Sequence, residues 1–157
     1  MKQFLFITTL ILSQIAHSAT SANLTVTVSP GFEVAGASAL FVAKNDFLPH
    51  CATGYLGGGH KGKVEEKFYA INQIEEQTYV INGQVSAPFS LACQYQYRTS
   101  QIDITAKGVR PCLYMEKDPG SCVWPTSVQF NPEKESHLNI SCQIEQDINT
   151  TVVCQKN

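Results

Sequence analysis

The residues best suited to chemistry in this chain gather in a glycine-rich stretch. Residues 57–63 read GGGHKGK and formally match the phosphate-loop pattern GxxxxGK. Val64 stands where that pattern needs a serine or threonine for magnesium, and no convincing strand precedes the stretch. A basic surface loop is the simpler interpretation, in which His60, Lys61 and Lys63 are candidate contacts for an anionic group.

The histidines suggest two further kinds of chemistry. His60, Lys61 and His137 form the general acid and base set of a hypothetical small secreted hydrolase or nuclease. His50 and His60 are the corresponding pair for a metal-binding protein. Both alternatives lack supporting spacing, because the chain has no GxSxG elbow and no HExxH helix pattern. We therefore expect no cofactor and no bound metal.

Six cysteines could also act, as thiols or as metal ligands, but their number and spacing favour disulfides. No two of them form a CxxC pair, which redox centres and zinc ribbons require. An even number behind a secretory signal is typical of a disulfide framework. The six positions are Cys51, Cys93, Cys112, Cys122, Cys142 and Cys154.

Local geometry ranks the possible pairings. The turn signal Asp118-Pro119-Gly120 brings Cys112 back toward Cys122. Cys142 and Cys154 end two apolar runs that neighbouring strands would place side by side, which leaves Cys51 for Cys93. A competing scheme joins Cys93 to Cys142 between two sheets. In the preferred scheme no thiol remains for catalysis.

The elements that must hold these residues are mostly strands. Leu24, Val26 and Val28 alternate with threonines up to Pro30 and Gly31, and residues 39–43 form an apolar run. Residues 91–97 place Leu91, Cys93, Tyr95 and Tyr97 on a packed face and leave Arg98 on the wet face.

Two segments carry more local signals. Asn82 and Gly83 predict a type I′ hairpin turn between residues 78–81 and 84–87. Residues 63–76 fit one short helix or a strand equally well, because Val64, Phe68 and Ile71 keep helical spacing. Eight or nine short strands with regular turns indicate a single antiparallel β-sandwich or barrel.

The first residues read as a targeting signal. Lys2 precedes an apolar stretch at residues 4–15, which is too short to span a bilayer. Small residues follow, so signal peptidase can cut after Ser18, Ala19 or Ala22. We therefore expect a secretory signal peptide at residues 1–19, a single disulfide-stabilised domain at residues 20–157, and a secreted or periplasmic location.

The charge and hydropathy of the chain argue against two classes of partner, nucleic acids and membranes. The formal net charge of −2 lacks the basic footprint of a nucleic-acid binder, and no second apolar run is long enough for membrane insertion. By subtraction we expect a non-enzymatic binding protein, such as an effector, an adhesin-like subunit or an inhibitor, that recognises another protein or a surface glycan. One version of this hypothesis has the alternating N-terminal strand donated to a neighbouring subunit.

Overall fold

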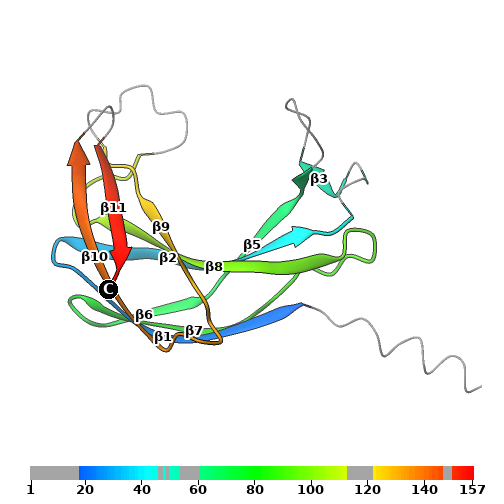
Figure 1. Cartoon of the computed structure of the whole chain (residues 1–157), viewed down its shortest axis with the longest axis horizontal. Coiled ribbons are helices and arrows are strands. Elements are labelled where there is room, and N and C mark those ends of the chain that lie inside the picture. The colour runs from blue at the N-terminus through cyan, green and yellow to red at the C-terminus, as the bar shows by residue number, and fades with distance from the viewer. Residues whose placement is uncertain (1–17, 46–47, 49, 54–60, 113–121, 147–149) are drawn as a thin grey trace, which may run out of the picture.

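Two β-sheets pack face to face in the computed structural model, which describes residues 18–45, 48, 50–53, 61–112, 122–146 and 150–157 (Figure 1). The five-stranded sheet has the order β11-β10-β1-β7-β6, the four-stranded sheet has the order β5-β2-β8-β9, and β3 pairs with β4 separately. The predicted all-β sandwich is confirmed. The strands are β1 (Ala19–Val28), β2 (Phe32–Ala43), β3 (Ala52–Thr53), β4 (Lys61–Gly62), β5 (Val64–Phe68), β6 (Ala70–Glu75), β7 (Thr78–Ser86), β8 (Tyr95–Ala106), β9 (Thr126–Phe130), β10 (His137–Gln146) and β11 (Thr150–Lys156).

The alternating N-terminal segment is a central strand, β1. Its apolar residues Leu24, Val26 and Val28 are buried between the sheets, where they join Phe41 of β2 and Ile102 of β8. β1 pairs antiparallel with β7 and parallel with β10. The pairing with β7 covers residues 19–27 and the pairing with β10 covers residues 25–28. Donation of this strand to a neighbouring subunit stays a prediction.

The possible helix at residues 63–76 is wrong, because this segment forms the edge strands β5 and β6. Val64 and Phe68 share helical spacing but are 49% and 65% exposed, so they belong to no buried helical face. β5 pairs with β2 in one sheet, and β6 pairs with β7 in the other. The chain changes sheets at the buried Tyr69, whose amide donates to the Ala37 carbonyl. Backbone pairing with two different sheets therefore overrides the local helical spacing.

The hairpin predicted at Asn82 and Gly83 is also wrong. Both residues lie inside β7, which pairs with β1 without interruption from Thr27↔Thr78 to Ala19↔Ser86. Gly83 does have a positive φ of 124°, but Asn82 does not, whereas a type I′ turn needs positive φ at both positions. The long partner strand β1 supplies hydrogen bonds on both sides of the dipeptide, and these outweigh its turn preference. The chain reverses instead between β6 and β7, at residues 76–77.

The three disulfides follow the preferred pairing. Cys51 is bonded to Cys93, Cys112 to Cys122, and Cys142 to Cys154, and the described residues include no free cysteine. The competing bond between Cys93 and Cys142 is not formed. Cys142 and Cys154 are direct partners across β10 and β11, as expected for neighbouring strands. Three disulfides in one domain are typical of an oxidising, extracellular-type environment.

The two sheets are also joined beside β9. The Trp124 amide donates to the Thr150 carbonyl, and the Val152 amide donates to the Trp124 carbonyl. These bonds tie the segment before β9 to β11 of the other sheet, so β11 lies close to β9. Within the part of the chain described by the structure, no helix has the length and apolar character of a membrane span.

Candidate binding cleft

The predicted anion-contacting loop is only partly described by the structure. His60 lies outside the described residues, and for Lys61 the structure describes the backbone, which forms β4. Lys63 is described, and its ammonium lies 2.6 Å from a carboxylate oxygen of Glu65. This hydrogen bond raises the pKa of Lys63 and lowers the pKa of Glu65. Lys63 therefore has a partner within the chain, and the role of this loop stays a prediction.

The residues of the two histidine hypotheses are also only partly described by the structure. His137 opens β10, is exposed, and lies 3.1 Å from the Ser136 hydroxyl through Nδ1. The catalytic set of His60, Lys61 and His137 cannot be assembled from described side chains, so it stays a prediction. His50 is exposed and lies against the bond between Cys51 and Cys93, with the three ligand atoms within 4.8 Å of one another.

That cluster is not a metal site while its sulfur atoms are bonded to each other. A disulfide sulfur lacks the thiolate charge that metal ions need, so only the His50 imidazole remains as a ligand. A single imidazole does not hold a metal ion in a protein site. His60, the other predicted ligand, lies outside the described residues.

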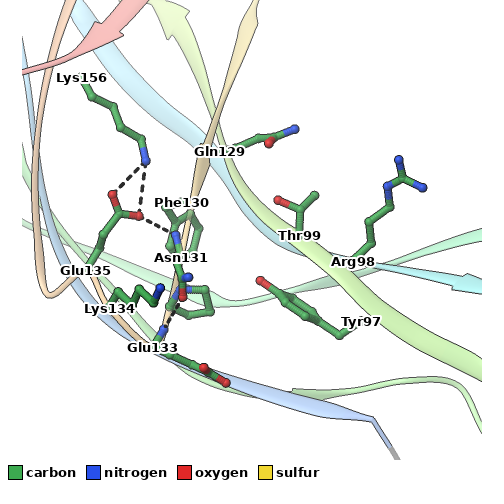
Figure 2. A pocket seen from close by; sticks show the side chains of 11 residues that line it. Tyr97, Arg98, Thr99, Gln129, Phe130, Asn131, Glu133, Lys134, Glu135 and Lys156 are labelled. Carbon is green, nitrogen blue, oxygen red and sulfur yellow. Dashed lines mark hydrogen bonds and ion pairs between the residues drawn. The ribbon is translucent and has the colours of Figure 1, made fainter.

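A different location has the shape of a binding site. An open cleft of about 640 Å³ lies where β8 runs past the end of β9. Residues 97–99 of β8 form one wall, residues 129–130 of β9 and the loop at residues 131–135 form the other, and Lys156 of β11 closes one side (Figure 2). The cleft exists because β9 pairs only as far as Ser100↔Phe130, after which Asn131 and Pro132 lead the chain out of the sheet.

A bulge in β8 places Arg98 at this cleft. The register with β2 passes from Leu40↔Thr99 directly to Phe41↔Tyr97, so Arg98 has no partner residue on β2. Such bulges change the direction of side chains and often lie near functional sites. Sequence alternation placed Arg98 correctly on the exposed face, but it missed the bulge. Leu91, which the same alternation placed on the packed face, is 67% exposed because it precedes the strand.

The loop at residues 131–135 is held by its own hydrogen bonds. The Asn131 carbonyl accepts from the Lys134 and Glu135 amides at 3.2 and 2.9 Å, and the Asn131 side chain accepts from the Glu133 amide at 3.0 Å. The Asn131 amide donates to the Glu135 carboxylate. The polar groups of Asn131 are thus bonded within the loop, and β9 does not continue along residues 95–99 of β8.

The charges of the cleft divide into paired and unpaired groups. The Lys156 ammonium donates to both Glu135 oxygens, at 2.9 and 3.3 Å (Figure 2). Partial burial acts to raise the pKa of Glu135, but the bonds from Asn131 and Lys156 outweigh it and hold this pKa below its ordinary value. By contrast, the exposed side chains of Arg98 and Lys134 make no hydrogen bond or ion pair with any described residue, and Figure 2 shows Arg98 extending away from the paired group.

Buried hydroxyls support the wall formed by β8. The Ser100 hydroxyl, which is fully buried, lies 2.9 Å from the Tyr69 hydroxyl and 3.1 Å from the Tyr97 hydroxyl. Burial raises the pKa of Tyr97, with Tyr69 and Glu133 adding to the rise and the hydrogen bond with Ser100 opposing it. Tyr97 is therefore neutral at physiological pH and serves as an uncharged, positioned hydrogen-bonding group.

No family model, no curated protein and no solved structure matches this chain. Sequence patterns did not predict this cleft. Two features that lie at it are visible in the sequence, namely the chain break at Asn131 and Pro132 and the position of Arg98 on the wet face of its strand. The pairing of β8 with a shorter β9, which brings them together, is a feature of the tertiary structure.

Proposed function

We propose that this protein is an exported, non-enzymatic binding module that uses the cleft between β8, β9 and residues 131–135 to recognise another protein. Export is supported by the charged and apolar N-terminal pattern, with small residues at the expected cleavage positions, and by the three disulfides. The targeting segment itself lies outside the described residues, except for the small residues from Ser18 onward.

The main support for a binding role is a pair of cationic side chains at the cleft. Arg98 and Lys134 present two cationic groups at the same open cleft without a partner among the described residues. Structural ion pairs in this fold are already made, as between Lys156 and Glu135, so these two cations have no evident role in stability. None of the described residues that line the cleft is a histidine or a cysteine, and the Glu135 carboxylate is already bound to Lys156. These features support recognition over nucleophilic or acid–base chemistry.

The test is capture of a partner by the exported protein. Tagged wild-type protein is incubated with extracellular and envelope fractions of the source cells, and captured partners are identified and then titrated as purified proteins. We expect saturable binding that weakens at least about tenfold in the double variant Arg98→Glu/Lys134→Glu, because reversing two unpaired charges opposes an acidic surface.

The matched control is Lys107→Glu, which reverses one charge on an exposed lysine that pairs with Glu76 away from the cleft. This control should bind like the wild type. Equal binding by the double variant, or no partner at micromolar protein, would show that the cleft is not a recognition site.

A further inference from the structure

We propose that the cleft takes an extended acidic segment of its partner, which adds to the four-stranded sheet alongside residues 95–99 of β8. This inference rests on the proposed function and specifies the chemistry of the partner. Three independent features support it. Residues 95–99 of β8 have one edge without a strand partner, the Ser18 hydroxyl already accepts a hydrogen bond from that edge, and the cations Arg98 and Lys134 lie beside it without ionic partners among the described residues.

The first feature is the difference in length between β8 and β9. β8 runs from Tyr95 to Ala106, but β9 pairs with it only between Ser100 and Ile104. Tyr95, Gln96, Tyr97 and Thr99 pair with β2 on their other side, and only Arg98, at the bulge, has no partner there. The second edge of residues 95–99 has no strand partner among the described residues. An extended peptide can pair with such an edge through main-chain hydrogen bonds.

The second feature shows that this edge accepts hydrogen-bonding partners. The Tyr97 amide donates to the Ser18 hydroxyl at 2.9 Å, and the Ser18 carbonyl accepts from the Ala87 amide at 2.7 Å. Ser18 is lost in every cleavage predicted from the sequence, whether after Ser18, Ala19 or Ala22. Processing would therefore leave the Tyr97 amide without its acceptor and open it to an incoming strand.

The third feature sets the charge of the segment. Arg98 projects from the bulge on the exposed face of β8, and Lys134 projects from the opposite wall. Neither has an ionic partner among the described residues, whereas Lys156 on the same cleft is paired with Glu135. A guanidinium next to an open strand edge favours a carboxylate on the partner strand. The expected ligand is thus an extended segment with acidic side chains on one face.

The test uses three capped seven-residue peptides and the chain that starts at Ala19. The first peptide alternates threonine and valine and carries two glutamates on one face. The second replaces the glutamates with lysines, and the third keeps the glutamates but is N-methylated at alternate amides. Binding is followed by amide shifts in the 15N-labelled protein and by fluorescence anisotropy.

We expect the acidic peptide alone to bind and to shift the amides of residues 97–99. Arg98→Glu should weaken it at least about fivefold and should allow the lysine peptide to bind, a charge exchange that a misfolded variant could not show. Lys107→Glu should leave binding unchanged. A chain that starts at Ser18 and keeps that hydroxyl should bind the acidic peptide more weakly than the chain that starts at Ala19.

Each other outcome overturns the proposal. Equal binding of the N-methylated peptide means that the site reads charge without strand pairing. Equal binding of the lysine peptide means that the cations do not select the ligand. Capture of a partner that depends on Arg98, together with no binding of any peptide, would retain the proposed function and reject only strand addition.

Discussion

Glu135 is the titratable residue that couples the cleft to stability. Its folded-state pKa lies below the ordinary carboxyl value, so its bonds to Asn131 and Lys156 stabilise the fold above the unfolded pKa of about 4.3. This contribution is lost as the pH falls through the folded pKa. We expect Glu135→Gln to lower the free energy of unfolding by up to about 1 kcal/mol at pH 7, and by progressively less below pH 4.

Urea unfolding of both proteins between pH 7 and pH 2 measures this difference. Glu133→Gln, a neighbour whose carboxylate has no described ion pair, is the control and should change stability little. A loss in Glu135→Gln that is the same at every pH would show that charge has no part in the effect.

Among the elements, β7 is where local preference and pairing disagree. Gly83 has a φ of 124°, and a Cβ built there would meet nothing closer than the Ala70 nitrogen at 3.9 Å. Gly83→Ala therefore forces backbone strain without a clash. We expect a loss of about 1 to 3 kcal/mol in the free energy of unfolding, measured by chemical denaturation.

Asn82→Ala distinguishes the strand from the predicted turn. In β7, Asn82 has an ordinary negative φ and pairs with Asn23 and Ala70, so its replacement should change stability by less than about 0.5 kcal/mol. In a type I′ turn Asn82 would need a positive φ, and alanine would then be as harmful as at Gly83.

For the whole molecule, the residue at which the chain starts decides how complete the five-stranded sheet is. Ala19, Thr20, Ser21 and Ala22 pair with residues 83–86 of β7, and Thr20 and Ala22 are buried. Cleavage after Ala22 would remove these pairings, whereas cleavage after Ser18 or Ala19 keeps all or most of them. We expect a chain that starts at Asn23 to melt at least about 5 °C below one that starts at Ala19.

Thermal unfolding followed by circular dichroism measures the two midpoints. A chain that starts at Thr20 is the control, because it loses only the exposed Ala19 and should melt close to the longer chain. Equal melting temperatures for all three chains would mean that the pairing of residues 19–22 of β1 with β7 adds nothing to stability.

Features that depend on near neighbours in the chain were predictable from the sequence. The alternation of Leu24, Val26 and Val28 specified a half-buried strand, because successive side chains of a strand point to opposite faces. The turn signal in the sequence before Cys122 and the matching apolar runs that end at Cys142 and Cys154 favoured two of the disulfides that form. The third followed by elimination, with a bond between Cys93 and Cys142 as the alternative.

Features that depend on pairing between distant segments came only from the tertiary structure. Asn82 and Gly83 form strand because β1, some sixty residues earlier, supplies hydrogen bonds on both sides. Residues 64–75 form strands because two different sheets pair with them. The cleft exists because β8 extends beyond the last residue that pairs with β9. A bulge in β8 places Arg98 beside it. Hydrogen bonds between distant segments determine the pairing register of the strands and which strand edges stay unpaired. Local residue preferences are too weak to determine either property.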